Sequence, residues 1–216
     1  MKIILDQVGK RYNRDWIFRN INFEFVKGEA YAILGANGSG KSTLLQLISG
    51  SITVSEGSIK YARPRPLSLS KGEEGEKLEP ENIFRYLSFA APYLELIEEY
   101  TLKESVGFHS KFKKFVSDFD NDKIIEITGL QNAKDKQLKY FSSGMKQRVR
   151  LALALLSDTS IVLLDEPATN LDKNGIDWYR NLIDIYSQNR LVIVCSNQQA
   201  HEYDFCKTQL NISDYK

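Results

Sequence analysis

Residues 35–42 have the types and spacing of a loop that binds phosphate. Gly35, Gly40, Lys41 and Ser42 occupy the fixed positions of the pattern GxxxxGK[ST]. Glycines let backbone N–H groups turn towards a β-phosphate, a lysine reaches the β- and γ-phosphates, and a serine hydroxyl ligates Mg²⁺. A glycine-rich turn without a ligand is the alternative. The residues expected to contact a nucleotide here are Gly35, Ala36, Asn37, Gly38, Ser39, Gly40, Lys41, Ser42 and Thr43.

A pair of carboxylates provides a second candidate part of the same site. Asp165 and Glu166 directly follow the apolar run 161–164, and a parallel sheet presents its ligand-binding groups where its strands end. We expect Asp165 to hold Mg²⁺ through water and Glu166 to polarise the water that attacks the γ-phosphate. An acidic pair that only ends a strand at the surface is the alternative.

This chemistry requires elements that bring the two segments together. Strands and helices are predicted in alternation, at 30–34, 42–49, 145–156, 160–164, 176–186 and 191–195. Such alternation indicates an α/β fold with a mainly parallel sheet covered on both faces. Apolar and polar residues alternate over 21–25, so further strands are expected before this core.

Two segments between these elements have a different character. Residues 65–81 are rich in serine, glycine, proline and glutamate, and are expected to form an exposed loop whose acidic residues are simply solvated. The segment 81–139 is mostly helical in pattern, with charged faces and spaced apolar residues. We therefore expect an additional helical subdomain.

Composition limits the possible functions. The 216 residues contain 29 Lys+Arg and 28 Asp+Glu, so the net charge of +1 offers no broad basic surface for nucleic acid. No apolar stretch approaches the roughly 18 residues of a membrane span, and the N-terminal apolar run is too short for a secretory signal, which predicts a cytoplasmic protein. Cys195 and Cys206 lack metal or redox spacing and are expected to be reduced and structural.

The motifs taken together resemble the ATP-binding subunit of ABC transporters over nearly the whole chain. Residues 141–148 read FSSGMKQR and precede the Asp-Glu strand, as the family signature does. The signature, usually LSGGQ, corresponds to Ser142, Ser143, Gly144 and Met145. The resemblance also implies a D-loop ending at Asp172 and a stacking of Tyr12 on adenine, although Tyr12 could equally be a packing residue.

The resemblance implies a complete architecture. It is a P-loop NTPase core with an N-terminal antiparallel β subdomain and an inserted helical subdomain. The core is expected at 1–86 and 158–216, and the helical signature subdomain at 87–157. ATP and Mg²⁺ are the implied cofactors.

The resemblance further implies a head-to-tail dimer with composite sites. Ser142 and the N–H groups of the following helix would face the γ-phosphate bound to the other subunit. Serines are also good N-cap residues, so these could merely cap their own helix. The implied partners are a second ATP-binding subunit, identical or different, and a separate integral-membrane permease that holds the protein at the cytoplasmic face of the membrane.

Several positions depart from the family pattern. Pro92 stands where a glutamine that contacts Mg²⁺ is expected, and Asn197 where a catalytic histidine is expected. An asparagine amide can hydrogen-bond a γ-phosphate but cannot become cationic, so slow hydrolysis is plausible. His201 could substitute, but a surface histidine is favoured. In the signature, Ser143 replaces a glycine and Met145 a glutamine.

These departures leave two functions open. The first is an ATPase that drives a membrane partner; Glu95, Glu98 and Glu99 near the docking region suggest, weakly, a basic partner helix. The second is a slow or non-hydrolysing ATP-gated regulatory module of the same fold. A soluble ATPase acting on nucleic acid or in cofactor assembly is disfavoured, because neither a basic stripe nor a coiled-coil insertion is present.

Overall fold

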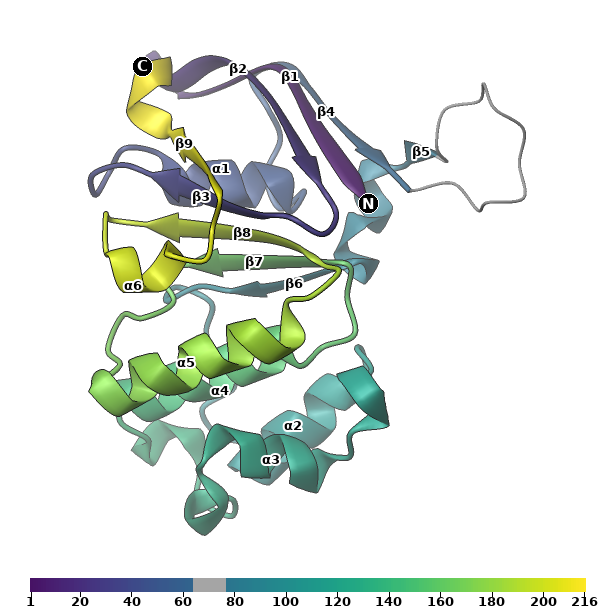
Figure 1. Cartoon of the computed structure of the whole chain (residues 1–216), viewed down its shortest axis with the longest axis vertical. Helices are drawn as coiled ribbons and strands as arrows, with labels where there is room; N and C mark the ends of the chain where they lie inside the picture. The colour runs from purple at the N-terminus through teal and green to yellow at the C-terminus, as the bar shows by residue number, and fades with distance from the viewer. Residues whose placement is uncertain (64–76) are drawn as a thin grey trace.

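A computed structural model of the chain describes residues 1–63 and 77–216 and contains two sheets with helices on both sides of the second (Figure 1). Most of the segment 65–81, expected to be an exposed loop, lies outside the described residues. Its described end forms a strand, β5 (Lys77–Leu78), that pairs with the strand β4 (Glu56–Ala62), and the start of a 3-10 helix, η1 (Pro80–Arg85). The loop prediction is therefore wrong at this end.

The N-terminal sheet is antiparallel and has the strand order β2-β1-β4-β5. It is built from β1 (Lys2–Tyr12), β2 (Asp15–Val26) and β4 (Glu56–Ala62) together with β5. One face of β1 and β2 is apolar and fully buried, whereas charged residues point outward. The expected antiparallel subdomain is confirmed.

The second sheet is parallel throughout and has the order β6-β7-β8-β3-β9. Its strands are β3 (Ala30–Leu34), β6 (Leu87–Ala90), β7 (Ile161–Asp165), β8 (Leu191–Ser196) and β9 (Thr208–Asn211). Every residue of β7 and β8 is buried, as expected for apolar strands covered on both faces. Because β8 lies between β7 and β3, the segments that follow these three strands emerge side by side.

Helices complete the layers. Helix α1 (Lys41–Ile48) lies between the two sheets, where its leucines join the core shared by β1, β2 and β3. Helices α4 (Ser143–Leu155) and α5 (Lys173–Tyr186) cover the opposite face of the parallel sheet (Figure 1). The predicted P-loop NTPase architecture is confirmed.

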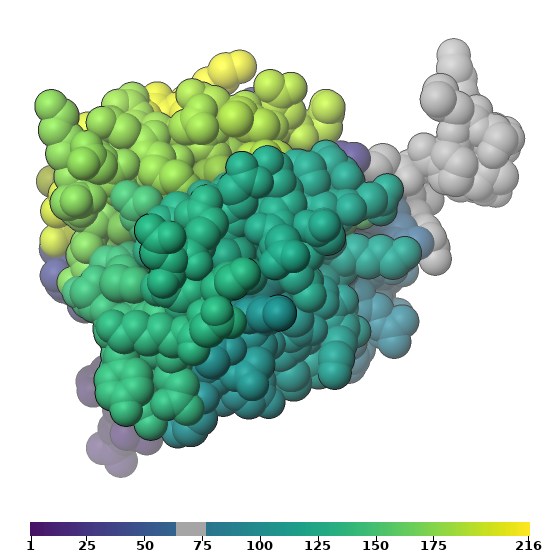
Figure 2. All heavy atoms as spheres, turned by 90° about the horizontal axis from the view of Figure 1, so that it is seen from below, coloured from purple at the N-terminus to yellow at the C-terminus, as the bar shows by residue number. Residues whose placement is uncertain are grey.

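The helical segment packs on the outer side of α4. Helix α2 (Leu102–Ser110) begins with a capping box between Thr101 and Glu104, and α3 (Asn121–Thr128) ends at Gly129 with φ +72°. Both helices share a third apolar core with α4, and the segment forms the teal surface of Figure 2. Strand β6 pairs with β7, so 87–90, assigned from the sequence to the helical subdomain, are part of the sheet.

Two helices begin earlier than the apolar pattern predicted, because polar residues cap them. Ser142 caps α4 and Asp172 caps α5, so these helices start at Ser143 and Lys173 and not at 145 and 176. The remaining short elements are η2 (Val116–Asp118), η3 (Gln131–Ala133), η4 (Leu138–Tyr140), α6 (Ala200–Tyr203) and η5 (Ile212–Tyr215). Among residues 1–63 and 77–216, no helix has the length and apolarity needed to cross a bilayer.

A buried arginine fixes the end of the sheet opposite to the phosphate loop. The Arg190 guanidinium, 7% exposed, precedes β8 and donates to the carbonyl oxygens of Thr159 at 2.8 Å and Leu155 at 2.6 Å. It also donates to the hydroxyls of Thr159 and Ser88. Burial lowers the pKa of Arg190 to about 10, so the group remains cationic at neutral pH and ties β6, β7 and β8 to the end of α4.

Candidate nucleotide-binding and catalytic site

The loop 35–40 joins β3 to α1 and depends on glycine at its last position. Gly40 is the N-cap of α1 and has φ +108°, a conformation that side chains disfavour. A Cβ at Gly40 would lie 2.5 Å from Cγ2 of Ile17, so any other residue would also collide with β2. The start of α1 therefore directs its free N–H groups towards the loop, as phosphate binding requires.

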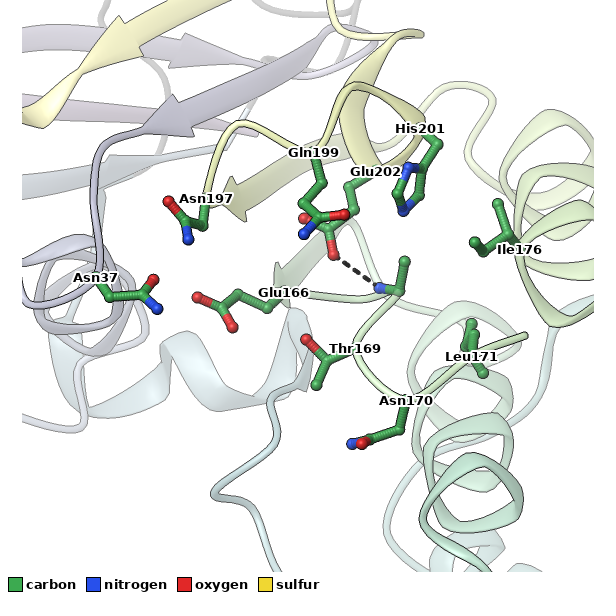
Figure 3. A pocket seen from close by; sticks show the side chains of 11 residues that line it. Asn37, Glu166, Thr169, Asn170, Leu171, Ile176, Asn197, Gln199, His201 and Glu202 are labelled. Carbon is green, nitrogen blue, oxygen red and sulfur yellow. Dashed lines mark hydrogen bonds between the residues drawn. The ribbon is translucent and has the colours of Figure 1, made fainter. Parts of the chain in front are cut away.

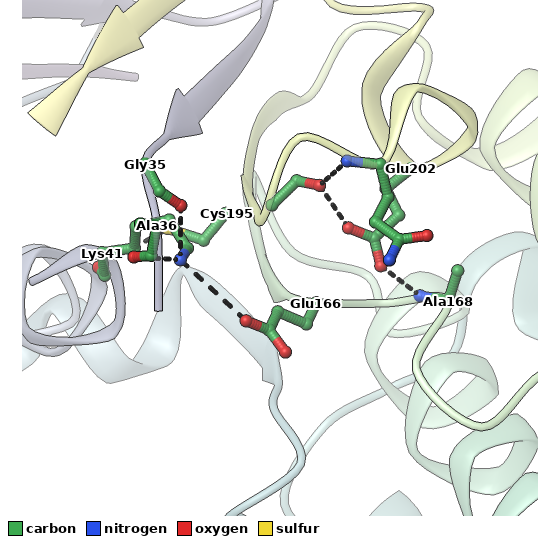
Figure 4. Close-up of polar contacts among 9 residues, drawn as sticks. Gly35, Ala36, Lys41, Glu166, Ala168, Cys195 and Glu202 are labelled. Atoms are coloured by element: carbon green, nitrogen blue, oxygen red, sulfur yellow. Dashed lines mark hydrogen bonds and ion pairs between the residues drawn. The ribbon is translucent and has the colours of Figure 1, made fainter. Parts of the chain in front are cut away.

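Lys41 is held at the centre of this loop. Its side chain is only 4% exposed, and Nζ donates to the carbonyl oxygens of Gly35 at 2.9 Å and Ala36 at 3.1 Å (Figure 4). Nζ also lies 4.0 Å from Oε1 of Glu166. The amine is thus positioned between the loop and the end of β7, where a bound phosphate could replace the carbonyl oxygens as its acceptor.

Asp165 has an unsatisfied buried carboxylate. The residue is 2% exposed, and neither side-chain oxygen has a hydrogen-bond partner. Burial raises the pKa of Asp165, while the nearby Ser42 hydroxyl opposes this shift. An orphaned carboxylate costs free energy unless a cation satisfies it, so Asp165 and Ser42 fit a hard divalent ion that takes its other ligands from phosphate and water.

Within the described residues no three His, Cys, Asp or Glu side chains form a metal-binding cluster.

Glu166 is presented in an unusual backbone conformation. Its φ is +44°, which is rare for a residue with a side chain and is found at sites where a group must be aimed. The Glu166 N–H donates to the carbonyl of Cys195 at 2.9 Å, which ties the end of β7 to β8. The side chain is 33% exposed and projects into an open pocket.

This pocket, of about 410 Å³, brings together the segments that follow β3, β7 and β8. Asn37 and Asn197 both lie beside the Glu166 carboxylate, whereas His201 lies further away (Figure 3). The position expected for a catalytic histidine is therefore filled by an amide. His201 lines the pocket but does not take the place beside Glu166.

Tyr93 is a further candidate site residue, which the sequence analysis missed. Pro92, predicted to occupy the glutamine position, is exposed after β6. The next residue, Tyr93, packs edge-on against Phe89 with 6.2 Å between ring centroids. Burial and the negative charge of Asp165 raise the pKa of Tyr93. The only sequence signal was the adjacency of a hydrogen-bonding side chain to Pro92.

The signature segment lies at the exposed N-terminus of α4. Ser142 and Ser143 are exposed, and the Ser142 hydroxyl accepts a hydrogen bond from the N–H of Met145 at 3.2 Å. Ser142 therefore does cap its own helix, as the simpler alternative held. A Cβ at Gly144 would lie 2.8 Å from the carbonyl oxygen of Asn170, so α4 packs directly on the expected D-loop.

Gln147 is a buried residue that also connects α4 to the expected D-loop. The sequence analysis missed it as well. It is 1% exposed, and its amide donates to the carbonyl of Pro167 at 2.9 Å. Asp172, at the end of the D-loop, accepts from the N–H of Gly175 at 2.7 Å and begins α5. Both ends of the segment 167–172 are thereby anchored to helices.

Tyr12 and the cysteines lie at the margins of the site. Tyr12, at the end of β1, is 48% exposed with the Lys10 ammonium 5.0 Å from its ring centroid. Cys195 and Cys206 are buried and free. Burial raises the pKa of Cys206 to about 12 and that of Cys195 well above its ordinary value, so the expected reduced, structural role is confirmed.

The chain is a P-loop nucleotide-binding protein, because a phosphate-binding loop lies between a strand and a helix and faces the acidic end of a second strand. Residues 18–169 match the family model for the ABC transporter. The chain belongs to this family, which confirms the resemblance drawn from the motifs. It is an ATP-binding subunit of the ABC type, a class whose activity is ATP hydrolysis.

Individual relatives cover nearly all of the chain. It is 30% identical over 206 residues to YybJ, an uncharacterized ABC transporter ATP-binding protein of Bacillus subtilis, covering 94% of this chain and 89% of that protein. It is 27% identical to the lantibiotic transport ATP-binding protein SrtF of Streptococcus pyogenes, covering 93% and 81%. The dimeric structure of a bacterial ABC transporter cassette has a TM-score of 0.78 at 23% identity, covering 98% of this chain and 95% of that one; at this identity the likeness concerns the fold.

Proposed function

We propose that the chain binds MgATP between its loop 35–42 and the signature segment of a second ATP-binding subunit, and that hydrolysis drives a separate membrane-spanning partner. The observation that carries this proposal is the Asp165 carboxylate, whose two oxygens are buried without partners beside the phosphate loop. A divalent cation bound with nucleotide phosphates would satisfy both oxygens.

The phosphate-binding half of the mechanism uses the loop and the end of β7. Lys41 exchanges the carbonyl oxygens that it now contacts for the β- and γ-phosphates, and the N–H groups of α1 bind the same phosphates. Ser42 and Asp165 would hold Mg²⁺, which when bound neutralises negative charge on the phosphate oxygens. No large change in the loop is required, because Lys41 is already aimed inward.

The hydrolytic half uses the pocket beside the loop. Glu166 orients and deprotonates the attacking water, since its partly exposed carboxylate lies next to Lys41 and hence to the γ-phosphate. Asn197 donates its amide N–H to a γ-phosphate oxygen. An amide donor adds no positive charge, so the charge that develops in the transition state would be stabilised chiefly by Lys41 and by the cation that Ser42 and Asp165 would hold.

The second subunit completes each site. Ser142, Ser143 and Gly144 start a helix of 13 residues, and their exposed N–H groups favour an anion supplied by another chain. Although Ser142 accepts a bond from Met145, its hydroxyl proton remains available to a phosphate. Tyr12 would stack on the adenine. A cassette of similar fold has been solved as a dimer, which supports this arrangement.

A groove at the helical segment would receive the membrane partner at the cytoplasmic face. It has a volume of about 350 Å³ and is lined mainly by apolar side chains, Phe84, Phe89, Leu94 and Leu96 among them, with Arg150 and Lys113. Of the acidic residues expected to attract a basic partner helix, Glu98 is paired with Lys146, whereas Glu95 lines the groove. The apolar lining favours an amphipathic helix.

The same proposal divides the chain into an ATP-binding core and a helical signature subdomain. Because β6 pairs within the parallel sheet, the helical subdomain starts after this strand and extends over 91–157. The core then comprises 1–90 and 158–216. The two are joined through α4 and the contact of Gly144 with Asn170.

Steady-state hydrolysis of MgATP by the purified protein and by Glu166→Gln tests the proposal. We expect the variant to retain nucleotide affinity and to lose at least roughly 10-fold in rate, as for removal of a general base. Equal background rates with intact binding would contradict hydrolysis and support the ATP-gated regulatory module, which Pro92 and Asn197 motivate. Purification of the tagged chain from native membranes should recover an integral-membrane protein; recovery of the chain alone would contradict the partner.

A further inference from the structure

The buried carboxylate of Glu202, which is given no contact with the nucleotide, connects two segments of the candidate site. Glu202 lies in α6 and is 2% exposed. One of its oxygens accepts from the N–H of Ala168 at 3.0 Å, and the other accepts from the Ser196 hydroxyl (Figure 4). No described lysine or arginine forms an ion pair with Glu202, so these two hydrogen bonds are its principal compensation.

The two partners of Glu202 occupy informative positions. Ser196 is the last residue of β8 and directly precedes Asn197, the candidate γ-phosphate contact. Ala168 lies two residues after Glu166 and begins the segment that leads to Asn170, whose carbonyl packs against Gly144 at the start of α4. A single side chain therefore connects the segment that would sense the γ-phosphate to the segment that would face the second subunit.

Two further hydrogen bonds hold the groups around Glu202 in place. The Ser196 hydroxyl also accepts from the N–H of Gln199 at 3.1 Å, which closes the turn after β8. The hydroxyl of Tyr179, on α5, donates to the backbone carbonyl of Glu202 at 2.9 Å and holds α6 in place without involving the carboxylate. Backbone anchoring of α6 and side-chain bridging are thus separate interactions that can be removed independently.

Stability alone does not favour a carboxylate at this position. Burying a charge without a counter-charge is unfavourable, and a fully apolar replacement of a buried polar network is often neutral or stabilising. A satisfied buried network does, however, impose one specific geometry. Glu202 therefore contributes a fixed arrangement of the two segments that it bridges.

We propose that Glu202 is a positioning residue that couples the segment 196–199 to the segment 168–170, so that contact of Asn197 with the γ-phosphate is transmitted to the D-loop. The inference rests on the proposed function, because it assumes that ATP binds in the pocket beside Glu166. Glu202 itself does not touch the nucleotide. Its loss leaves phosphate binding by Lys41 intact and uncouples the D-loop from that event.

Hydrogen exchange with and without MgATP tests this coupling on the full chain. In the wild type, ATP should protect the loop 35–42 and, together with it, the segment 168–171. In Glu202→Leu, which removes both acceptor oxygens, and in Ser196→Ala, ATP should still protect 35–42, while the protection of 168–171 should be largely lost. Tyr179→Phe is the matched control, because it loosens α6 but keeps the carboxylate bridge; its ATP-induced protection at 168–171 should equal that of the wild type.

Kinetics provide a second readout. We expect Glu202→Leu to lower kcat roughly 10-fold, the order of loss for a misplaced catalytic group, with KM changed less than about two-fold. Tyr179→Phe should lower the thermal midpoint without this kcat effect. The proposal is overturned if Glu202→Leu retains wild-type protection at 168–171, or if Tyr179→Phe reproduces its kinetic defect. Absence of ATP-induced protection at 35–42 in the wild type would instead contradict the proposed function.

Discussion

The ammonium of Lys41 and the carboxylate of Glu166 lie 4.0 Å apart although they follow different strands of the sheet. Lys41 starts α1 after β3, Glu166 follows β7, and β8 separates the two strands. The backbone of Glu166 closes this gap, because its left-handed conformation and its hydrogen bond to Cys195 turn the side chain back over β8. The opposed charges are thus assembled before any nucleotide arrives.

Replacing Lys41 by methionine should abolish tight nucleotide binding. The substitution removes the only ammonium inside the described part of the phosphate loop, and a lost charge-assisted contact of this kind should weaken ATP roughly 100-fold. Titration calorimetry measures the change. Lys60→Met, which removes an exposed lysine paired with Asp6, is the control and should bind ATP normally. Unchanged affinity in Lys41→Met would contradict the assigned role.

Asp165→Asn should separate stability from metal binding. Burial raises the pKa of Asp165 above its ordinary value of 3.8, so between these two pKa values the native state binds more protons than the unfolded state. This contribution to stability is therefore complete at low pH and is lost as pH rises through the raised pKa. The asparagine variant should lack that loss and melt at a higher temperature without nucleotide at neutral pH.

The same variant should no longer respond to Mg²⁺. In the wild type, adding Mg²⁺ to an ATP-containing sample should raise the thermal midpoint further, because the ion binds only the native site. Asp165→Asn should show no such increment. A variant that melts lower than the wild type and retains the Mg²⁺ increment would contradict both expectations.

Tyr93→Phe should slow hydrolysis with little effect on ATP affinity. The phenol lies where Asp165 influences its ionisation, and loss of one hydrogen bond corresponds to about a 2- to 10-fold change. Steady-state kinetics give kcat and KM separately. Tyr140→Phe, at a tyrosine that is 61% exposed, should change neither. If both variants behave alike, Tyr93 has no part in the reaction.

Asn197 should contribute through its amide. We expect Asn197→Ala to lower kcat about 3- to 10-fold, the order expected for one neutral donor to a charged group. Asn197→His should raise kcat, since an imidazolium adds positive charge beside the γ-phosphate. His201→Ala is the control and should leave kcat unchanged, because His201 lies further from Glu166 than Asn197 does (Figure 3). A large loss in His201→Ala would exchange the roles of the two residues.

Two glycine-to-alanine substitutions in helices should have opposite effects. At Gly107 in α2 an added Cβ would find only the amide of Asn121, at 3.5 Å, so alanine should stabilise the fold by about 0.5–1 kcal/mol. At Gly144 the Cβ would lie 2.8 Å from the Asn170 carbonyl, so alanine should displace the D-loop and weaken ATP-driven dimerisation. Denaturant titration and light scattering measure the two effects; a dimer of normal strength in Gly144→Ala would contradict the packing argument.

Site residues that are contiguous in the sequence could be predicted, whereas residues whose partners lie far away along the chain could not. The phosphate loop and the Asp165-Glu166 strand end were found because each is contiguous, and the alternation of strands and helices predicted the parallel sheet. Glu202 was missed because its partner Ala168 lies 34 positions away. Gln147 was missed for the same reason, since its contact with Pro167 spans 20 positions.

The ends of the helices and of the helical subdomain could be predicted less well than the elements themselves. Apolar spacing located the cores of α4 and α5 but not their starts, which the capping serine and aspartate determine. The assignment of 87–90 to the helical subdomain failed because β6 is defined by its pairing with β7. A four-residue strand has too little pattern of its own to reveal that partner.

The anchoring of Arg190 gives the sheet two ends with different responses to acid. At the nucleotide end, burial raises the pKa values of the Asp165 and Glu202 carboxylates. These two groups therefore become protonated at a higher pH than ordinary carboxylates. At the opposite end, the guanidinium is held by carbonyl and hydroxyl oxygens that do not titrate. Mild acid is therefore expected to protonate the carboxylates at the nucleotide end of the sheet while the hydrogen bonds of Arg190 at the opposite end persist.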